Sequence, residues 1–424
     1  MAELMLGRAL RHEAEASVPH GRSGSAILGR ETEMRMDQLG DLIEAPFDTG
    51  RLDRLMDAAG IDLLLATSQP VVRYLLGGYR SSFFAHFDAV GLSRHLPIYL
   101  YSAGAPERAR YIGHRLEMWQ LEAAPLPVPQ AEASSNGSAD AMRRAVDACA
   151  QLPRAPSRIG VELPFLPADA YAVLRDAFPS AQVVDAVALL ERLRAVKSPA
   201  ELDLLRRASE QVIEAMLAVM AQGAGRSKRD LVETLRREQV NRGLDFDYCL
   251  ITAGRSHNRA ATDQHWNEGD VLSLDSGGNF QGYIGDVCRM GILGEPDAEL
   301  HDLLAEIDSV QQAAFRTVRA GNPGQAVYDG ADQALRSAPN RGHIDFLAHG
   351  MGLVTHEVPH LAQHGNSAAD DADRPLEVGM VLSIETTLKH RRGYIKLEDT
   401  VVVGREGFTM LGEAGRGWNR GGAS

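Results

Sequence analysis

The 424-residue chain contains only three cysteines, Cys149, Cys249 and Cys288, and no CxxC pair. Single cysteines so widely spaced argue against both a disulfide framework and a thiolate zinc site. No apolar run approaches the roughly 20 residues that a membrane-spanning helix requires. The N-terminus carries charged residues where a signal peptide needs an apolar core, so we expect a cytoplasmic protein that does not enter a membrane.

An excess of positive charge is also missing. The sequence has 44 Lys and Arg residues against 57 Asp and Glu residues, which gives a formal net charge of −13. A chain this acidic does not attract nucleic-acid phosphates over its whole surface, so we expect no nucleic-acid partner. Its length is enough for two domains of about 100–200 residues each.

The order of predicted elements divides the chain into three parts. Residues 1–45 form a peripheral extension, and residues 46–193 alternate strands with helices, which is typical of an α/β domain with a mixed or parallel sheet. A second domain is predicted over residues 194–424. Ser198 suits the N-cap of its first helix and Pro199 the first helical position. Two helices followed by a hairpin then occur twice, which suggests two halves that enclose one site.

The first of these hairpins is predicted over residues 271–293, where two apolar runs flank a polar, Gly-rich centre. If the turn is centred between Phe280 and Gln281, Asp275 faces Asp286. Like charges directly opposite each other destabilise a ladder. Such a pair therefore favours a cation between the two carboxylates.

The second hairpin is predicted over residues 379–404, around Arg391 and Arg392. With the turn centred there, Glu385 faces Glu398 across the ladder. Two acid pairs, each inside an apolar run, are not typical of ordinary exposed strand charges. Four carboxylates are too many for one metal ion with an open position, so the pattern favours two ions about 3.5–4 Å apart.

Two histidines lie between the hairpins, in the segment His349-Gly350-Met351-Gly352-Leu353-Val354-Thr355-His356. Histidine is the commonest neutral metal ligand and the commonest general acid or base near neutral pH. The two glycines let the backbone pass close to another group. One or two imidazoles combined with four carboxylates suit Mn, Fe, Co or Zn.

Together these motifs resemble the creatinase/aminopeptidase P/prolidase superfamily, the pita-bread metallopeptidases, over nearly all of the chain after residue 45. The resemblance includes the opening phrase Arg194-Ala195-Val196-Lys197-Ser198-Pro199-Ala200-Glu201. It implies an α/β (α+β) fold in which a creatinase-like N-terminal domain precedes a pita-bread catalytic domain. It also implies five metal ligands, in chain order Asp275, Asp286, His349, Glu385 and Glu398. The intact set argues against a creatinase proper, in which the metal ligands are replaced.

The resemblance further implies dinuclear hydrolysis of an amide bond, most simply in an Xaa-Pro dipeptide or peptide. It implies two divalent ions, of which Mn is the first candidate and Zn, Co or Fe are alternatives, and Asp286 and Glu398 would bridge them. Glu385 would carry the proton as general base and then acid, and His356 would hydrogen-bond the carbonyl or oxyanion. Members of this family usually pair as homodimers, so we expect one here.

Several positions depart from the pattern of the family on the substrate side. Many relatives carry a histidine in the loop before the first ligand, where this chain offers His257 or His265. Lys396 stands where relatives often have Arg, and Asp345 where aminopeptidase P-like enzymes tend to have His. Arg80 is a further candidate for a residue that lines the substrate-binding site. These departures leave recognition of proline open.

Three other functions compete with an Xaa-Pro peptidase. The first is hydrolysis of a small non-peptide amide or cyclic amidine, as in the ectoine hydrolase-like branch. The second is a dimethylsulfoniopropionate lyase-like enzyme, which is disfavoured because Ser273 and Gly277, rather than an extra acid, flank Asp275. The third, a non-catalytic binding module, predicts broken ligands, and none is broken.

Overall fold

The computed structural model describes residues 45–81, 95–361 and 371–422. The predicted extension, residues 1–45, lies outside the described residues except for Ala45. Within the described part of the chain, no helix has both the length and the hydrophobicity of a membrane span.

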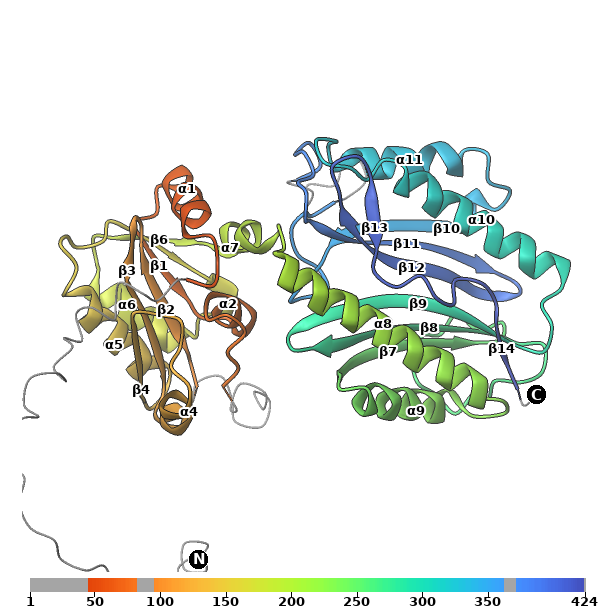
Figure 1. Ribbon diagram of the computed structural model, residues 1–424, viewed down its shortest axis with the longest axis horizontal. Helices are drawn as coiled ribbons and strands as arrows, with labels where there is room; N and C mark the ends of the chain where they lie inside the picture. The colour runs from red at the N-terminus through yellow and green to blue at the C-terminus, as the bar shows by residue number, and fades with distance from the viewer. Residues whose placement is uncertain (1–44, 82–94, 362–370, 423–424) are drawn as a thin grey trace, which may run out of the picture. The chain divides into compact units, whose positions relative to one another are not determined.

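The first sheet has six strands in the order β4-β3-β2-β1-β5-β6 (Figure 1). Its strands are β1 (Leu63–Ala66), β2 (Ile98–Ser102), β3 (Ala105–His114), β4 (Gln130–Ser135), β5 (Arg158–Val161) and β6 (Gln182–Asp185). The pairs β1/β5, β5/β6 and β3/β4 are parallel, and β1/β2 and β2/β3 are antiparallel. The sheet is therefore mixed, as the alternation of elements predicts.

Helices cover both faces of this sheet. They are α1 (Thr49–Ala59), α2 (Gln69–Leu75), η5 (Arg115–Glu117), α4 (Met118–Ala123), α5 (Ser138–Cys149), η6 (Leu163–Phe165), α6 (Ala168–Ala177) and α7 (Val187–Arg194). Leu64 packs with α1, α2 and α7, whereas Leu63 and Leu65 pack with α5 and α6. Because side chains alternate along a strand, β1 contributes to a core on each side.

The second sheet has eight strands, six of them in the order β10-β11-β12-β9-β8-β7. They are β7 (Asp245–Ala253), β8 (Val271–Phe280), β9 (Tyr283–Leu293), β10 (Ile344–Gly350), β11 (Val381–His390) and β12 (Gly393–Val403). The two others are β13 (Phe408–Met410) beside β12 and β14 (Asn419–Gly421) beside β9.

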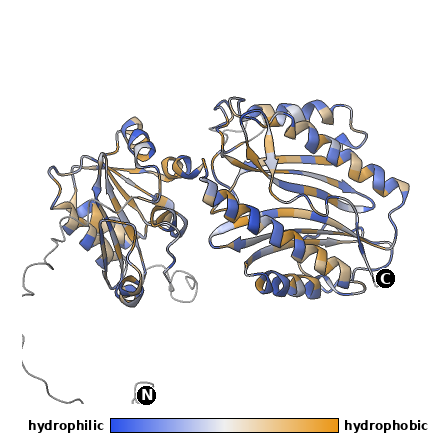
Figure 2. Ribbon diagram, viewed as in Figure 1, coloured by the Kyte–Doolittle hydropathy of each residue, from blue (hydrophilic) through white to orange (hydrophobic). Residues whose placement is uncertain are grey.

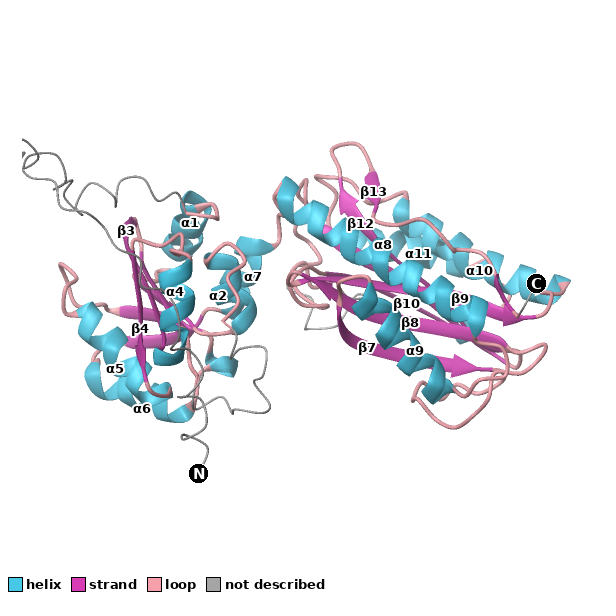
Figure 3. Ribbon diagram, turned by 60° about the horizontal axis from the view of Figure 1, so that its bottom comes forward, coloured by secondary structure: helices cyan, strands magenta, loops and turns pink. Residues whose placement is uncertain are grey.

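Two pairs of helices cover one face of this sheet. They are α8 (Pro199–Gln222) with α9 (Lys228–Asn241) and α10 (Ala298–Phe315) with α11 (Gln325–Leu335), and a short η7 (Arg341–His343) precedes β10. The first pair packs on β7–β9 and the second on β10–β12 (Figure 1 and Figure 3). In Figure 2, hydrophobic bands alternate with hydrophilic ones along α8. The predicted repeat of two helices and a hairpin is therefore confirmed.

The capping prediction at the start of α8 is also confirmed. The Ser198 hydroxyl accepts from the Glu201 backbone N–H at 3.3 Å, and the Glu201 carboxylate accepts from the Ser198 N–H at 2.8 Å. This reciprocal capping box satisfies two backbone donors, and Pro199 occupies the first turn, where no donor is needed.

The predicted register of the first hairpin is wrong by two residues. Asp275 pairs with Cys288, and Asp286 pairs with Gly277. The turn takes Gln281 and Gly282, both at positive φ, and the Asn279 side chain accepts from the Gly282 N–H at 2.6 Å. Such a two-residue turn requires left-handed backbone, which glycine adopts without strain. The two aspartates still share one face, as diagonal neighbours instead of directly opposed residues.

The predicted register of the second hairpin is confirmed, because Glu385 pairs with Glu398 around a turn at Arg391 and Arg392. β12 in turn pairs with β9 at Glu398 and Cys288. A single row across the sheet therefore runs Glu385, Glu398, Cys288, Asp275. Directly paired residues point to the same face, so tertiary pairing of the two hairpins places three carboxylates together.

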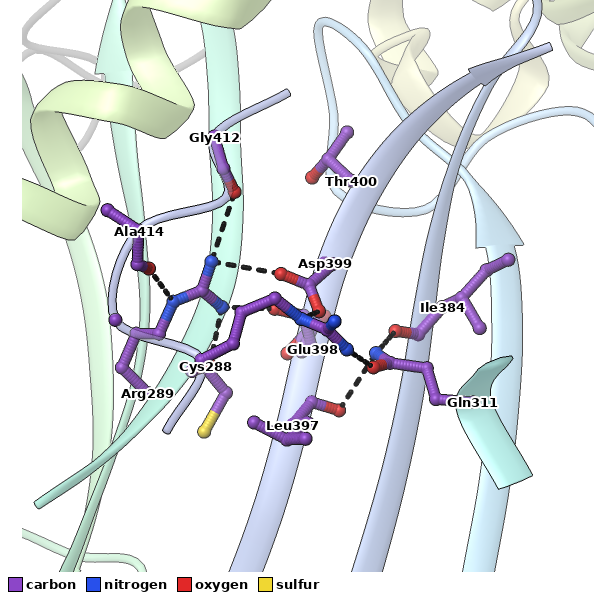
Figure 4. Close-up of polar contacts among 12 residues, drawn as sticks. Cys288, Arg289, Gln311, Ile384, Leu397, Glu398, Asp399, Thr400, Gly412 and Ala414 are labelled. Carbon is purple, nitrogen blue, oxygen red and sulfur yellow. Dashed lines mark hydrogen bonds and ion pairs between the residues drawn. The ribbon is translucent and has the colours of Figure 1, made fainter. Parts of the chain in front are cut away.

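The pairing of the two hairpins is held from the helix face by Arg289 (Figure 4). Its Nη1 donates to the backbone carbonyls of Cys288 at 2.9 Å and Glu398 at 3.0 Å, one on each strand. Its Nη2 lies 2.9 Å from Asp399, and neither side chain is exposed to solvent. Gln311 of α10 donates to the Ile384 carbonyl at 2.8 Å and so ties β11 to the same region. One buried ion pair thus fixes the backbone directly behind Glu398.

We expect Arg289→Met to lower the free energy of unfolding by about 3–5 kcal/mol, because the two strand carbonyls lose their donor and the buried Asp399 carboxylate keeps only Arg416 of its two guanidinium partners. Urea denaturation measures this change. Arg420→Met is the control, because Arg420 pairs with Glu295 on the surface, and such changes stay within about 0.5 kcal/mol. Equal losses in the two variants would show that the buried pair does not hold the sheet together.

Candidate metal centre

The five predicted ligands converge on the face of the second sheet opposite the helices. Leu274 and Ile384 face the helices, and their neighbours Asp275 and Glu385 therefore face away. Among the described residues, two groups bring their ligand atoms within 4.8 Å of one another. The first is Asp286, His349 and Glu398, and the second is Asp275, Glu385 and Glu398. Glu398 belongs to both groups, so they are two parts of one site.

Neutral donors orient the first group. The Tyr248 hydroxyl donates to Asp286, and the Ser383 hydroxyl donates to Glu398 Oε1 at 2.9 Å. His349 Nδ1 lies 3.2 Å from the Gly350 carbonyl. If that nitrogen carries the proton, Nε2 is left with a lone pair for a metal ion.

Burial makes this group unfavourable without a cation. Asp286 and Glu398 are buried, and their pKa values are raised by desolvation, for Asp286 also by the neighbouring acids Glu398 and Asp275. Desolvation lowers the pKa of His349 to about 4, so its imidazole is neutral near pH 7. Glu398 Oε2 is buried and lies 2.9 Å from the Lys396 ammonium. The donor set therefore fits a divalent first-row ion.

Two basic side chains reach the second group. Lys396 Nζ lies 2.6 Å from Asp275 Oδ2 and 2.9 Å from Glu398 Oε2, and it also forms an ion pair with Glu385. Arg259 forms an ion pair with the same oxygen of Asp275. The two groups thus differ, because ammonium and guanidinium already meet the carboxylates of the second.

His356 lies against the first group because its loop folds back. The Glu357 N–H donates to the Gly350 carbonyl at 3.0 Å, and the His356 ring stacks on His349 with centroids 3.8 Å apart. A Cβ on Gly350 would come within 2.5 Å of the Glu357 carbonyl oxygen, and one on Gly352 within 2.4 Å of its carboxylate. The two glycines therefore do allow a close backbone approach. Desolvation and the neighbouring His349 lower the pKa of His356 to about 4, although its side chain is exposed.

Glu357, next to His356, anchors this loop to the segment before α8. Its carboxylate accepts from Arg194 Nε at 2.7 Å and from Lys197 Nζ at 2.8 Å. Desolvation opposes the charge of the fully buried carboxylate, but the two cations outweigh it and lower its pKa. The opening phrase of the second domain therefore helps to position His356.

Comparison with known proteins places this chain in a family. The family described as "Metallopeptidase family M24" matches residues 203–405, and "Creatinase/Prolidase N-terminal domain" matches residues 49–196. The chain belongs to the creatinase/aminopeptidase P/prolidase superfamily. The predicted family and fold, a creatinase-like domain followed by a pita-bread domain, are confirmed.

Individual members of the superfamily have low sequence identity to this chain. An Xaa-Pro dipeptidase from Pyrococcus furiosus is 26% identical over 234 residues, which are 53% of this chain and 64% of the relative. A probable dipeptidase PepE from Mycobacterium bovis is 29% identical over 231 residues, 53% of this chain and 60% of the relative. The chain thus spans about three fifths of the length of these curated relatives.

Solved structures of the superfamily share the fold. An Xaa-Pro dipeptidase from Bacillus anthracis superposes with a TM-score of 0.72 at 20% identity, covering 88% of this chain and 98% of the other. An X-Pro aminopeptidase from Thermotoga maritima gives 0.68 at 19% identity, covering 87% and 99%. At these identities the likeness concerns the fold alone.

The predicted substrate-side residues of this superfamily member lie in different places. Lys396 is at the metal ligands, as described above. His257 contacts the His390 carbonyl at 3.1 Å, beside the second hairpin turn. His265 pairs with Ser227 at the start of α9, and Arg80 forms a surface ion pair with Asp245 at 2.6 Å. The roles of these residues in substrate binding stay predictions.

Sequence reasoning missed three residues that contact the predicted ligands, Tyr248, Arg259 and Ser383. Arg259 lies two positions after His257, in the loop where many relatives carry a histidine. Its guanidinium also lies 5.5 Å from the centre of the Tyr394 ring. A Cβ at Gly277 would come within 2.4 Å of the Tyr248 ring, so this glycine makes room for the tyrosine. Only the pairing of β7 with β8 reveals that relation.

We expect Glu357→Gln to lower the free energy of unfolding at pH 7 by about 3–5 kcal/mol, because two buried cations lose their counter-charge. The folded pKa of Glu357 lies below the unfolded value of about 4.3. Its contribution is therefore present above that pH and is lost as the pH falls through the folded pKa. The difference between wild type and variant, measured by urea denaturation, should shrink below about pH 4.

Glu233→Gln is the matched control, because Glu233 pairs with Arg236 on the surface of α9. It should leave stability unchanged at every pH. A pH-independent loss in Glu357→Gln would contradict the buried ion pair as its cause.

Proposed function

We propose that this protein is a metal-dependent hydrolase of amide bonds that acts on Xaa-Pro dipeptides or short peptides. The observation that supports this proposal is the convergence of Asp286, His349 and Glu398 from three strands. Membership of a metallopeptidase family agrees with it.

Asp286, His349 and Glu398 would hold a divalent ion, and Tyr248 and Ser383 would orient the two carboxylates from behind. A divalent ion at such a site polarises a carbonyl and lowers the pKa of a bound water. Mn²⁺ is the first ion to test, because carboxylate-rich sites with one imidazole suit it, although Zn²⁺, Co²⁺ and Fe²⁺ are also compatible.

Glu385 would transfer the proton between the attacking water and the leaving amine. Its side chain is 13% exposed, compared with 4% for Asp275 and 2% for Glu398, so it is the carboxylate that substrate or water reaches most easily. His356 would donate a hydrogen bond to the substrate carbonyl, because its neutral ring keeps one N–H near pH 7.

The substrate class rests on the relatives. Those named above are an Xaa-Pro dipeptidase and a probable dipeptidase. We carry this specificity to the present chain as a proposal, together with a cytoplasmic homodimer and the domain boundary at residues 193/194.

We expect the protein reconstituted with Mn²⁺ to release free proline from a panel of Xaa-Pro dipeptides and tripeptides, and a chelator to abolish the release. The ratio of dipeptide to tripeptide turnover separates the two kinds of peptidase. No proline from metal-loaded protein would contradict the proposed substrate class. Screening of small cyclic and N-acylated amides would then test the alternative that His257, Asp345 and Lys396 mark a different pocket.

We expect His356→Ala to keep its bound metal and to have a kcat lower by a factor of about 10²–10³, which is the typical effect of removing one oxyanion donor. Steady-state kinetics and metal analysis of the same preparation measure both quantities. His301→Ala, on an exposed position of α10, is the control and should retain full activity. Full activity in His356→Ala would remove this residue from the mechanism.

A further inference from the structure

Lys396 occupies a position that the ligand geometry otherwise offers to a metal ion. Its ion-pair partners are Asp275, Glu385 and Glu398. The same three carboxylates form the second of the two groups with the geometry to hold an ion. The ammonium therefore lies among the ligand oxygens themselves.

The backbone keeps the lysine there. Lys396 lies two residues before Glu398 on β12, so its side chain must point to the carboxylate face. The side chain is 4% exposed, and a buried ammonium is tolerated where carboxylates pair with it. A lysine ammonium is a compact point charge, more like a metal ion in this respect than the flat guanidinium of arginine.

The charges of the site support one further cation instead of two. Four carboxylates carry four negative charges, and Lys396 and Arg259 meet two of them with positive charges. One divalent ion neutralises the remaining two charges. Asp286 accepts from the neutral Tyr248 hydroxyl, and His349 Nδ1 lies beside the Gly350 carbonyl, so this is where that ion is needed.

We propose that Lys396 takes the place of one of the two metal ions of the family, so that this chain binds a single divalent ion at Asp286, His349 and Glu398. The proposal rests on the metal-dependent function proposed above. It replaces the expected pair of ions by one ion and one built-in ammonium.

Metal stoichiometry tests this without reference to activity. Chelator-stripped protein is equilibrated with Mn²⁺ by dialysis, and bound metal is counted by mass spectrometry. We expect about one ion per chain in wild type and about two in Lys396→Met, which opens the second group at nearly constant side-chain length. Lys389→Met is the control, because Lys389 lies on the same hairpin and pairs with Asp345 at the surface, and it should bind about one ion.

Electron paramagnetic resonance of the same samples gives a second measurement. Wild type should show an isolated Mn²⁺ signal, whereas Lys396→Met should show coupled ions, because metals about 3.5–4 Å apart interact magnetically. Asp286→Ala should lose the single ion of the wild type.

Two coupled ions in wild type would overturn the proposal, as would one ion in a folded Lys396→Met. If that variant does not fold, the wild-type count and spectrum still decide. A single ion without proline release would support the role of Lys396 and refute the proposed substrate. Two ions with proline release would refute the role of Lys396 and support the proposed substrate.

Discussion

The pairing of β9 with β12 is the constraint on which the rest of the site depends. Each hairpin by itself contributes two acids, and Glu398 meets Asp275 only because Glu398 pairs with Cys288, the neighbour of Asp275 in the row. Arg289 holds that pairing from the helix face by binding a carbonyl of each strand. The sheet thus places the Arg289–Asp399 ion pair on its helix face and the predicted ligands on the other face. A stable backbone behind the carboxylates allows them to remain close despite their mutual repulsion.

The two halves of the site balance their charge differently. Around Asp286 and His349, the neighbouring hydroxyl and carbonyl orient the ligands but leave the negative charge in place. Around Asp275, Lys396 and Arg259 supply positive charge from the chain itself. A fixed ammonium does not exchange with solvent and cannot acidify a water as a metal ion does. Under the single-ion proposal, the ion would perform the chemistry and the lysine would maintain the charge balance.

A buried ion pair also holds the loop that carries His356, away from the predicted ligands. Two glycines allow the backbone to fold back, and Glu357 anchors the turn to Arg194 and Lys197. The segment that precedes α8 therefore also positions His356, which we propose contacts the substrate. These contacts join residues about 160 positions apart in sequence.

The sequence by itself determined the candidate ligand residues, the capping of α8 and the register of the second hairpin, because these depend on local spacing and on turn residues that follow one another. It did not determine the first register, since the left-handed positions fell on Gln281 and Gly282 instead of on Phe280 and Gln281. Only the tertiary structure decided that β9 lies beside β12, that Tyr248 fills the space above Gly277, and that Arg259 and Lys396 reach Asp275. The physical reason is that these contacts depend on hydrogen bonds and buried charges between strands far apart in the sequence. The local pattern of polar and apolar residues does not specify them.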